Sequence, residues 1–122
     1  MTTVLVPRPV PHRGAPRRGV AIASGLNGHL EAGQLHGLFA GDTRVLSTYR
    51  LTIHGQAWQL VGRSRAGHAT ALYVFQNPAT RDIWSDLPSG VLFLGLRRRL
   101  AGALHDDLRL SSFAERRVQV QL

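Results

Sequence analysis

A period of two in the apolar residues is the feature of this sequence that most restricts its fold. Across residues 44–54 apolar and polar side chains alternate, in the order Tyr49, Arg50, Leu51, Thr52, Ile53 and His54. Successive side chains of a β-strand point to opposite faces of the sheet, so this pattern predicts a strand with one buried face. The turn pair His54-Gly55 and the apolar run at 57–61 complete a predicted hairpin.

Further short apolar runs predict the rest of an antiparallel structure. They cover residues 20–23, 69–76, 91–96 and 118–122, with turn signals at 25–28 and 77–78. The run at 91–96 is apolar throughout, which is typical of a strand that is buried on both faces. We therefore expect an all-β fold, an antiparallel β-sandwich built from short strands.

The segment 96–110 fits two different structures. Its leucines recur every four residues, at Leu96, Leu100, Leu104 and Leu108, a spacing that is typical of an amphipathic helix. Gly95 and Gly102 disfavour a helix, and residues 108–110 alternate as they would in a strand. We favour a hairpin that turns at Ala101-Gly102 and keep the helix as the alternative.

Residues 1–18 differ in composition from the rest of the chain. Four of the six prolines lie between residues 7 and 18, together with four arginines and no acidic residue. Proline fixes φ and lacks an N–H donor, so we expect residues 1–18 to form a flexible Pro/Arg-rich arm. Residues 19–122 then form one β-sandwich domain, which suits a chain of 122 residues.

The composition excludes several classes of site. The chain has no cysteine, and all 15 of its basic residues are arginine. Disulfides, zinc–thiolate sites, P-loops and Schiff-base lysines are therefore ruled out. The formal net charge of +8 suggests a polyanion as partner, but its placement weakens this idea. Four arginines of the arm supply half of the charge, and the remaining +4 is unremarkable for the rest of the chain, which disfavours nucleic acid as the partner. A polyanion-binding or nucleic-acid-binding module that uses the arm is one candidate function.

The sequence contains no segment that we expect to enter a membrane. No apolar run approaches the ~20 residues that a membrane-spanning helix needs. The proline-rich N-terminus also lacks the apolar core of a signal peptide. We therefore expect a cytoplasmic protein.

Patterns typical of catalytic or metal sites are missing from the sequence. There is no Gly-x-Ser-x-Gly motif and no His-x-His or His-x-x-x-His spacing. We interpret His29, His36 and the acidic run 105–107 as surface groups. No spacing selects a pair for glycoside hydrolysis from the seven carboxylates, Glu31, Asp42, Asp82, Asp86, Asp106, Asp107 and Glu115. We therefore expect no catalytic residue, no metal ligand and no cofactor.

Two charged motifs remain. In the glycine-flanked stretch 36–47, Asp42 can accept backbone N–H groups in a turn, and Arg44 could pair with it. This arrangement fits a structural loop with an internal ion pair, or a binding loop. In the run 97–99, the first and third arginines share one face of a strand and Arg98 points to the other. We interpret all three as solvated charges at the end of a strand.

The stretch 36–47 resembles the N-terminal domain of bacterial glycogen-debranching proteins of the amylo-α-1,6-glucosidase type. The matching residues are Gly37, Leu38, Phe39, Asp42, Thr43, Arg44, Leu46 and Ser47. The similarity continues through Asn77-Pro78 and residues 96–99 and 108–110, so that it covers about residues 20–122.

The resemblance implies an all-β, sandwich-like domain that precedes an (α/α)₆-barrel glycosidase domain, and the catalytic carboxylates belong to that barrel. The sequence departs from the family pattern at 106–107 and 112–113, and the last segments of the pattern are missing. The domain is therefore expected to be incomplete at its C-terminus. Residues 118–122 would then be an unpaired edge strand through which a homo-oligomer could form.

We therefore expect a non-catalytic module that supports a glycosidase barrel, present as a domain or as a separate chain, or that contacts α-glucan. Trp58, Tyr73 and Trp84 are the candidates to stack on sugar rings, with core packing as the alternative for the two tryptophans. Asp42 and Arg44 would add polar contacts. The alternative functions are the polyanion-binding module and a domain that serves only oligomerisation.

Overall fold

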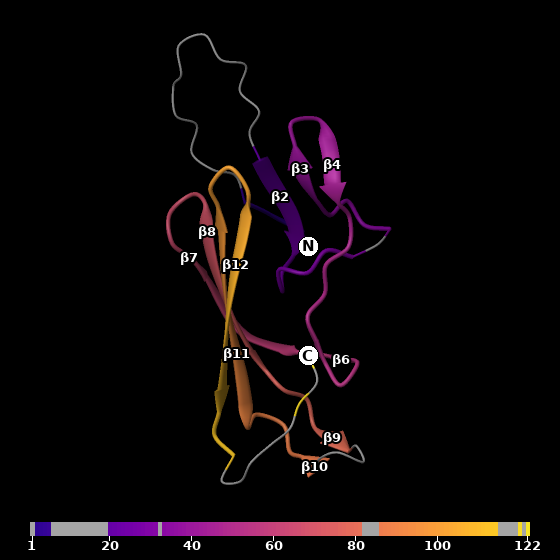
Figure 1. Ribbon diagram of the computed structural model, residues 1–122, viewed down its shortest axis with the longest axis vertical. Coiled ribbons are helices and arrows are strands. Elements are labelled where there is room, and N and C mark those ends of the chain that lie inside the picture. Colours follow the sequence, from indigo (N-terminus) through magenta and orange to yellow (C-terminus); the bar gives the residue numbers. More distant parts are fainter. Residues whose placement is uncertain (1, 6–19, 32, 82–85, 115–119, 121) are drawn as a thin grey trace.

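The computed structural model describes residues 2–5, 20–31, 33–81, 86–114, 120 and 122. Every regular element in this part is a strand, which confirms the expected all-β class (Figure 1). The strands are β1 (Thr2–Leu5), β2 (Val20–Gly25), β3 (Gly37–Ala40), β4 (Thr43–Leu46), β5 (Thr52–Ile53), β6 (Gln56–Ala57), β7 (Gln59–Arg65), β8 (Thr70–Gln76), β9 (Thr80–Arg81), β10 (Asp86–Leu87), β11 (Leu92–Leu100) and β12 (Leu104–Ser112). The described residues accordingly include no helix that is long and apolar enough to cross a membrane.

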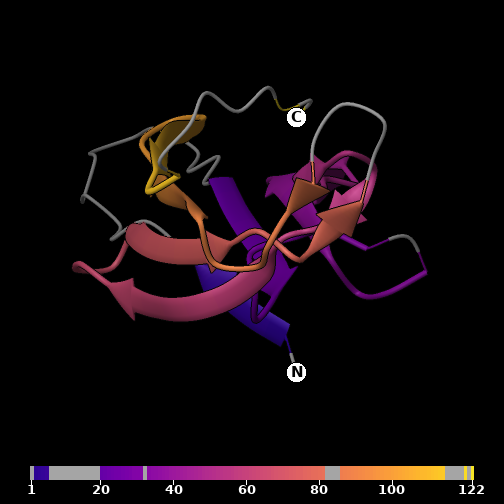
Figure 2. The same cartoon turned by 90° about the horizontal axis from the view of Figure 1, so that it is seen from below.

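Two four-stranded antiparallel sheets form the body of the molecule. The N-terminal sheet has the strand order β1-β2-β3-β4, and the C-terminal sheet has the order β12-β11-β8-β7. The pairs β5–β6 and β9–β10 form two small ribbons, which lie beside the lower half of the C-terminal sheet in Figure 1. Seen from below, the C-terminal sheet is curved (Figure 2).

The hydrophobic core lies on the inner face of the C-terminal sheet, where residues of the N-terminal sheet and of the two ribbons pack against it. Strands β8 and β11 bury every second side chain, and these apolar residues are at most 4% exposed: Ala71, Tyr73, Phe75, Leu92, Leu94, Leu96 and Leu100. From the N-terminal side, Ile22 on β2 and Leu30 after it join the same cluster. Full burial of such a side chain stabilises the fold by about 1.5–3 kcal/mol, so the contact between the sheets is a main source of stability.

The turn predicted at His54-Gly55 is confirmed, but the strand predicted before it is too long. His54 has a φ of 49° and Gly55 a φ of 74°, as a two-residue type I′ turn requires, and the turn joins β5 to β6. The prediction of a single strand over residues 44–54 is wrong. Between β4 and β5 the chain leaves the N-terminal sheet and pairs only through Tyr49 with Leu30, because Tyr49 turns towards the C-terminal sheet.

The return strand predicted over 57–61 is also wrong. Strand β6 ends at Ala57 and β7 begins at Gln59, and Trp58 between them turns into the core. Strand β7 then pairs with β8 instead of continuing the ribbon, with a shift of register between Leu60 and Gly62. Burial of a large aromatic side chain therefore ends one hairpin and starts the next.

The hairpin favoured for residues 96–110 is confirmed. Strands β11 and β12 pair along their whole length, from Leu92 opposite Ser112 to Leu100 opposite Leu104. The strand predicted over 91–96 exists, but the expectation that both its faces are buried is wrong. One face is fully buried, whereas Phe93 on the other face is only half-buried. The centre of its ring lies 5.5 Å from that of Phe113, in a T-shaped contact.

The expected N-terminal arm is only partly described. Thr2–Leu5 forms β1 and pairs with β2, so these residues belong to the N-terminal sheet instead of a flexible arm. Apolar and β-branched residues precede the first proline here, which suits a strand. The rest of the arm and most of the predicted strand 118–122 lie outside the described residues.

The fully buried side chain of Asn77 joins the end of β8 to the start of β11. Its Oδ1 accepts the N–H groups of Val91 at 3.0 Å and Leu92 at 2.9 Å. Its Nδ2 donates to the carbonyl oxygens of Pro78 at 2.9 Å and Pro88 at 3.0 Å. The Asn-Pro signal therefore marks a structural anchor, in which four backbone groups share one amide.

Replacing Asn77 with alanine should strongly destabilise the fold. The Asn77→Ala variant leaves buried donors and acceptors without partners, and we expect the free energy of unfolding to fall by about 3 kcal/mol. Urea unfolding measures the change. The control Gln56→Ala, on the exposed ribbon strand β6, should change it by about 0.5 kcal/mol or less. An equal loss of stability in the two variants would contradict the role of Asn77 as a structural anchor.

Candidate functional site

Of the five residues that were expected to contact a sugar, the structure does not bring together the four that it describes. Asp42 and Arg44 are exposed on the β3–β4 hairpin. Trp58 and Tyr73 are each only 4% exposed within the core, and Trp84 lies outside the described residues. The rings of Trp58 and Tyr73 pack against the protein, so neither offers an open face to a pyranose.

Side chains of the stretch 36–47 pack β3 and β4 of the N-terminal sheet against each other. The Arg44 guanidinium lies 5.5 Å from the centre of the Phe39 ring, on the opposing strand. A Cβ on Gly37 would lie 3.0 Å from Arg44 Cγ, so the glycine makes room for the arginine stem. The expected ion pair between Arg44 and Asp42 is not formed by these two described residues.

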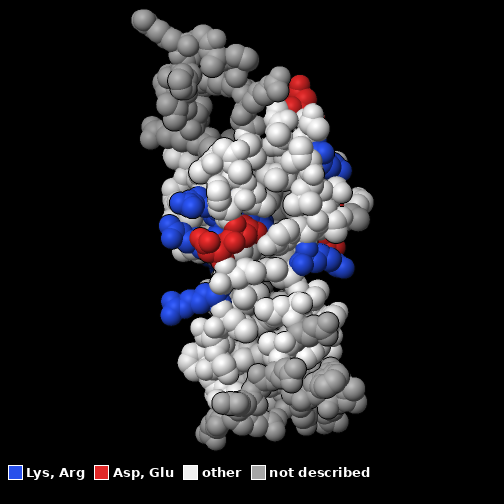
Figure 3. Space-filling view, in the orientation of Figure 1, with Lys and Arg blue, Asp and Glu red and all other residues white. Residues whose placement is uncertain are grey.

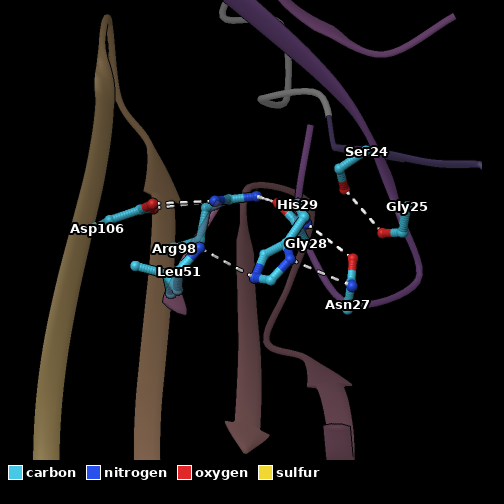
Figure 4. A network of polar contacts seen from close by, with 8 residues as sticks. All are labelled: Ser24, Gly25, Asn27, Gly28, His29, Leu51, Arg98 and Asp106. Atoms are coloured by element: carbon cyan, nitrogen blue, oxygen red, sulfur yellow. Dashed lines mark hydrogen bonds and ion pairs between the residues drawn. The ribbon is translucent and has the colours of Figure 1, made fainter. Parts of the chain in front are cut away.

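Arg98 is a fully buried charged group at the centre of a polar network in the core (Figure 4). It lies on the core-facing side of β11, between Leu96 and Leu100, and has no exposed surface. Its Nε and Nη2 donate to the two carboxylate oxygens of Asp106, each at 3.0 Å. Its Nη1 donates to the carbonyl oxygen of Gly28, in the turn after β2.

The interpretation of residues 97–99 as solvated charges is therefore wrong for Arg98, although Arg97 and Arg99 are exposed. The alternation correctly placed Arg98 on the other face. A signal in the sequence was available, because that face of the strand otherwise carries only leucine. The acidic run 105–107 is not a solvated turn either: Asp106 stands directly opposite Arg98 on β12 and is largely buried.

Two tyrosine rings complete the surroundings of Arg98. Its guanidinium carbon lies 5.2 Å from the centre of the Tyr49 ring and 5.9 Å from that of Tyr73. Burial alone would lower the pKa of Arg98, but the hydrogen bonds and charge of Asp106 outweigh it and raise that pKa. Burial and then Asp106 raise the pKa of Tyr49 to about 12, so Tyr49 stays neutral beside the ion pair.

Gly28 fits closely against the side chains around Arg98. Its φ is +79°, and a Cβ there would lie 3.1 Å from Tyr73 Cζ and 3.3 Å from Arg98 Nη1. Only glycine combines that backbone conformation with such close contacts. The turn predicted at 25–28 is thus also the point where the N-terminal sheet meets the buried arginine.

His29 and His36 are buried, so their interpretation as surface groups is wrong. The His29 ring stacks on Phe75 with centres 5.8 Å apart, accepts the Leu51 N–H at Nε2 (3.4 Å), and has Nδ1 at 3.3 Å from Asn27 Nδ2. Burial and then the charge of Arg98 lower the pKa of His29, which favours the neutral ring.

The described carboxylates do not converge on one point. Asp106 is held by Arg98, whereas Asp107 points to the opposite face of the same strand. Glu31 pairs with the exposed Arg50, with 3.4 Å between Oε1 and Nη2. The described side chains also include no group of three or more acidic or histidine residues that could hold a metal ion.

Charged groups on the surface form no single-sign patch on the face shown in Figure 3. Basic and acidic side chains there are interspersed across the middle of the molecule. On the outer face of the C-terminal sheet, Arg97 lies directly opposite Asp107. The basic residues of the arm lie outside the described residues, so the structure adds nothing to the polyanion alternative.

One comparison with known proteins gives a match. Residues 18–122 match the family model described as the N-terminal domain of some glycogen debranching enzymes. No curated protein and no solved structure shows a significant match.

Removing the carboxylate of Asp106, the partner of the buried Arg98, should lower the stability of the fold more than removing that of its exposed neighbour Asp107. We expect Asp106→Ala to lower the free energy of unfolding by about 3–5 kcal/mol, because it leaves the Arg98 charge buried without its carboxylate. The control Asp107→Ala, one residue on and exposed, should change it by about 0.5 kcal/mol. Urea unfolding compares the two variants, and a loss in Asp106→Ala as small as in the control would refute the structural role.

The stability of the fold should decrease in mild acid because of His29. Its pKa is lowered from 6.5 in the folded chain, so the unfolded chain binds the proton more readily. The free energy of unfolding should therefore fall as the pH drops below about 6.5, until the folded pKa is passed. Urea midpoints at about pH 7.5 and about pH 5 measure this difference. It should shrink in His29→Gln but not in His68→Gln, an exposed control; an unchanged difference in His29→Gln would contradict the assignment.

Proposed function

The chain belongs to the family of N-terminal domains of glycogen debranching enzymes, and from this we propose that it is a non-catalytic module that supports the glycosidase domain of such an enzyme. The dispersed carboxylates support a non-catalytic role, because glycoside hydrolysis needs two carboxyl groups on either side of one bond. Asp106, the most buried of the described ones, is committed to holding Arg98.

The proposal rests on two leucines of β12 whose side chains are only partly covered by the rest of the protein. Leu108 and Leu110 stand opposite Leu96 and Leu94, on the core-facing side of the sheet. Leu94 and Leu96 are each 1% exposed, whereas Leu108 is 49% and Leu110 43% exposed. The core-facing surface thus continues past the covered part of the sheet, and uncovered apolar surface of this kind marks contact sites.

The family supplies the occupant that we propose for this surface. We expect a domain that is N-terminal in a larger enzyme to pack on the remainder of that enzyme. The family resemblance implies that this remainder contains a helical glycosidase barrel. Just beyond β12, Phe113 is 71% exposed, but its ring contacts Phe93 on the outer face of the sheet and is not part of this surface. Below the charged groups in Figure 3, the described surface on this side carries no charged side chain.

Charge on the β12 leucines should abolish binding to the glycosidase domain. The double variant Leu108→Asp/Leu110→Asp buries two carboxylates in the proposed contact, so we expect its affinity to fall at least about tenfold. The matched control is Leu72→Asp/Val74→Asp, at similarly exposed positions on the outer face of β8. Interferometry measures binding to the glycosidase domain of a family member whose own N-terminal domain has been removed.

Equal binding by both variants, or no binding by the unmodified chain, would contradict the proposal. A dimer of the chain that the β12 variant dissociates, without any binding to the glycosidase domain, would assign this surface to self-association. Release of sugar from a branched α-glucan by the chain alone would contradict the non-catalytic role.

A further inference from the structure

A polar depression of about 480 Å³ lies where the loops of the N-terminal sheet meet β7. Its lining includes Leu26, Asn27, Glu31, Gln34, His36 and Leu60. All of these except Leu60 come from the turns between β2 and β3, and Leu60 comes from the C-terminal sheet. The volume falls in the range of small-molecule sites, which often form where two parts of a fold meet.

The depression offers neutral donors and acceptors of hydrogen bonds. Asn27 Oδ1 accepts the N–H of His29 at 3.0 Å, and Asn27 Nδ2 lies 3.3 Å from His29 Nδ1. At most one of the two amide hydrogens can be directed at that ring nitrogen, so at least one is available to a ligand. His36 Nδ1 accepts the N–H of Glu31 at 3.0 Å, which leaves the proton of the neutral ring on Nε2 as a donor. Gln34 is exposed and provides a complete amide.

The charges of the described lining residues favour a neutral ligand. Among these residues Glu31 is the only charged one, and Arg50 lies against that carboxylate at 3.4 Å. A phosphate or sulfate would meet no cation among the described lining residues, and a metal ion would meet no second carboxylate among them. Hydroxyl groups both donate and accept, so a neutral, hydroxyl-rich ligand matches the amides, the imidazole and the carboxylate. Leu26 and Leu60 would contact its C–H surface.

We propose that this depression binds a glucosyl unit of an α-glucan, as an auxiliary site on a non-catalytic module. The choice of polymer rests on the proposed function, since the family is named for glycogen debranching. In the C-terminal sheet, Leu60 lies on one edge strand, β7, and the leucine pair of β12 lies on the other. One edge can therefore contact glucan while the opposite edge contacts the glycosidase domain.

An NMR titration of the labelled 122-residue chain with maltotetraose tests this site. We expect saturable shifts at the backbone amides of Leu26, Asn27 and Gln34, and none along β12. Gln34→Ala should weaken binding about fivefold, as expected for one lost hydrogen bond. Gln34 is exposed, so this variant should keep the fold, and Gln56→Ala is the control with an equally exposed glutamine elsewhere.

The absence of saturable shifts, shifts centred elsewhere, or equal affinities in Gln34→Ala and the control would overturn the proposal. Glucose 6-phosphate that binds the depression more tightly than glucose would overturn the argument from charge. Sugar shifts in a chain that does not bind the glycosidase domain would refute the docking proposal alone. Docking without sugar shifts would refute the glucan site alone.

Discussion

The buried ion pair between Arg98 and Asp106 is the interaction on which the packing of the two sheets depends. A charged guanidinium in a leucine-lined core is tolerated only when its donors are satisfied, because desolvation costs several kcal/mol. Asp106 and Tyr73 come from the C-terminal sheet, whereas Gly28 and Tyr49 come from the N-terminal part. Leucine packing alone tolerates changes of shape, but this cluster fixes how the sheets meet.

This structural use of charge shapes what the domain can do. Among the described residues, the most buried carboxylate serves the fold, the neutral His29 stacks on Phe75 in the core, and the other acidic groups are dispersed. The two proposed contact surfaces lie at the edges of the C-terminal sheet, one apolar at β12 and one polar beside β7, where Glu31 is the only charged residue among the described lining residues. Both suit binding to large partners better than chemistry on small ones.

The period of two was sufficient to predict the all-β class, because burial on one face of a strand follows directly from it. The leucines at every fourth position fitted a helix and a strand equally, since four residues also return to the same face of a strand. Gly102 favoured the hairpin correctly. The prediction of a single strand over 44–54 was wrong. Alternation indicates which side chains are buried, but it does not specify the strand with which a segment pairs.

The candidate site was harder to predict than the fold. Arginine is usually solvated, and the carboxylate that holds Arg98 could be identified only once the register of β11 and β12 was known. Aromatic residues such as Trp58 do not reveal in sequence whether their faces are covered. The polar depression combines a turn, a loop and a distant strand, and no local spacing in the sequence brings these together.

Native-state hydrogen exchange in Arg98→Met tests most directly whether Arg98 joins the two sheets. The backbones of Leu30 and Tyr49 form two hydrogen bonds with each other in the N-terminal part, whereas Phe75 and Leu94 pair within the C-terminal sheet. The account predicts that the amides of Leu30 and Tyr49 lose protection by at least about tenfold more than those of Phe75 and Leu94. Equal loss of protection in both groups, or none in either, would contradict it.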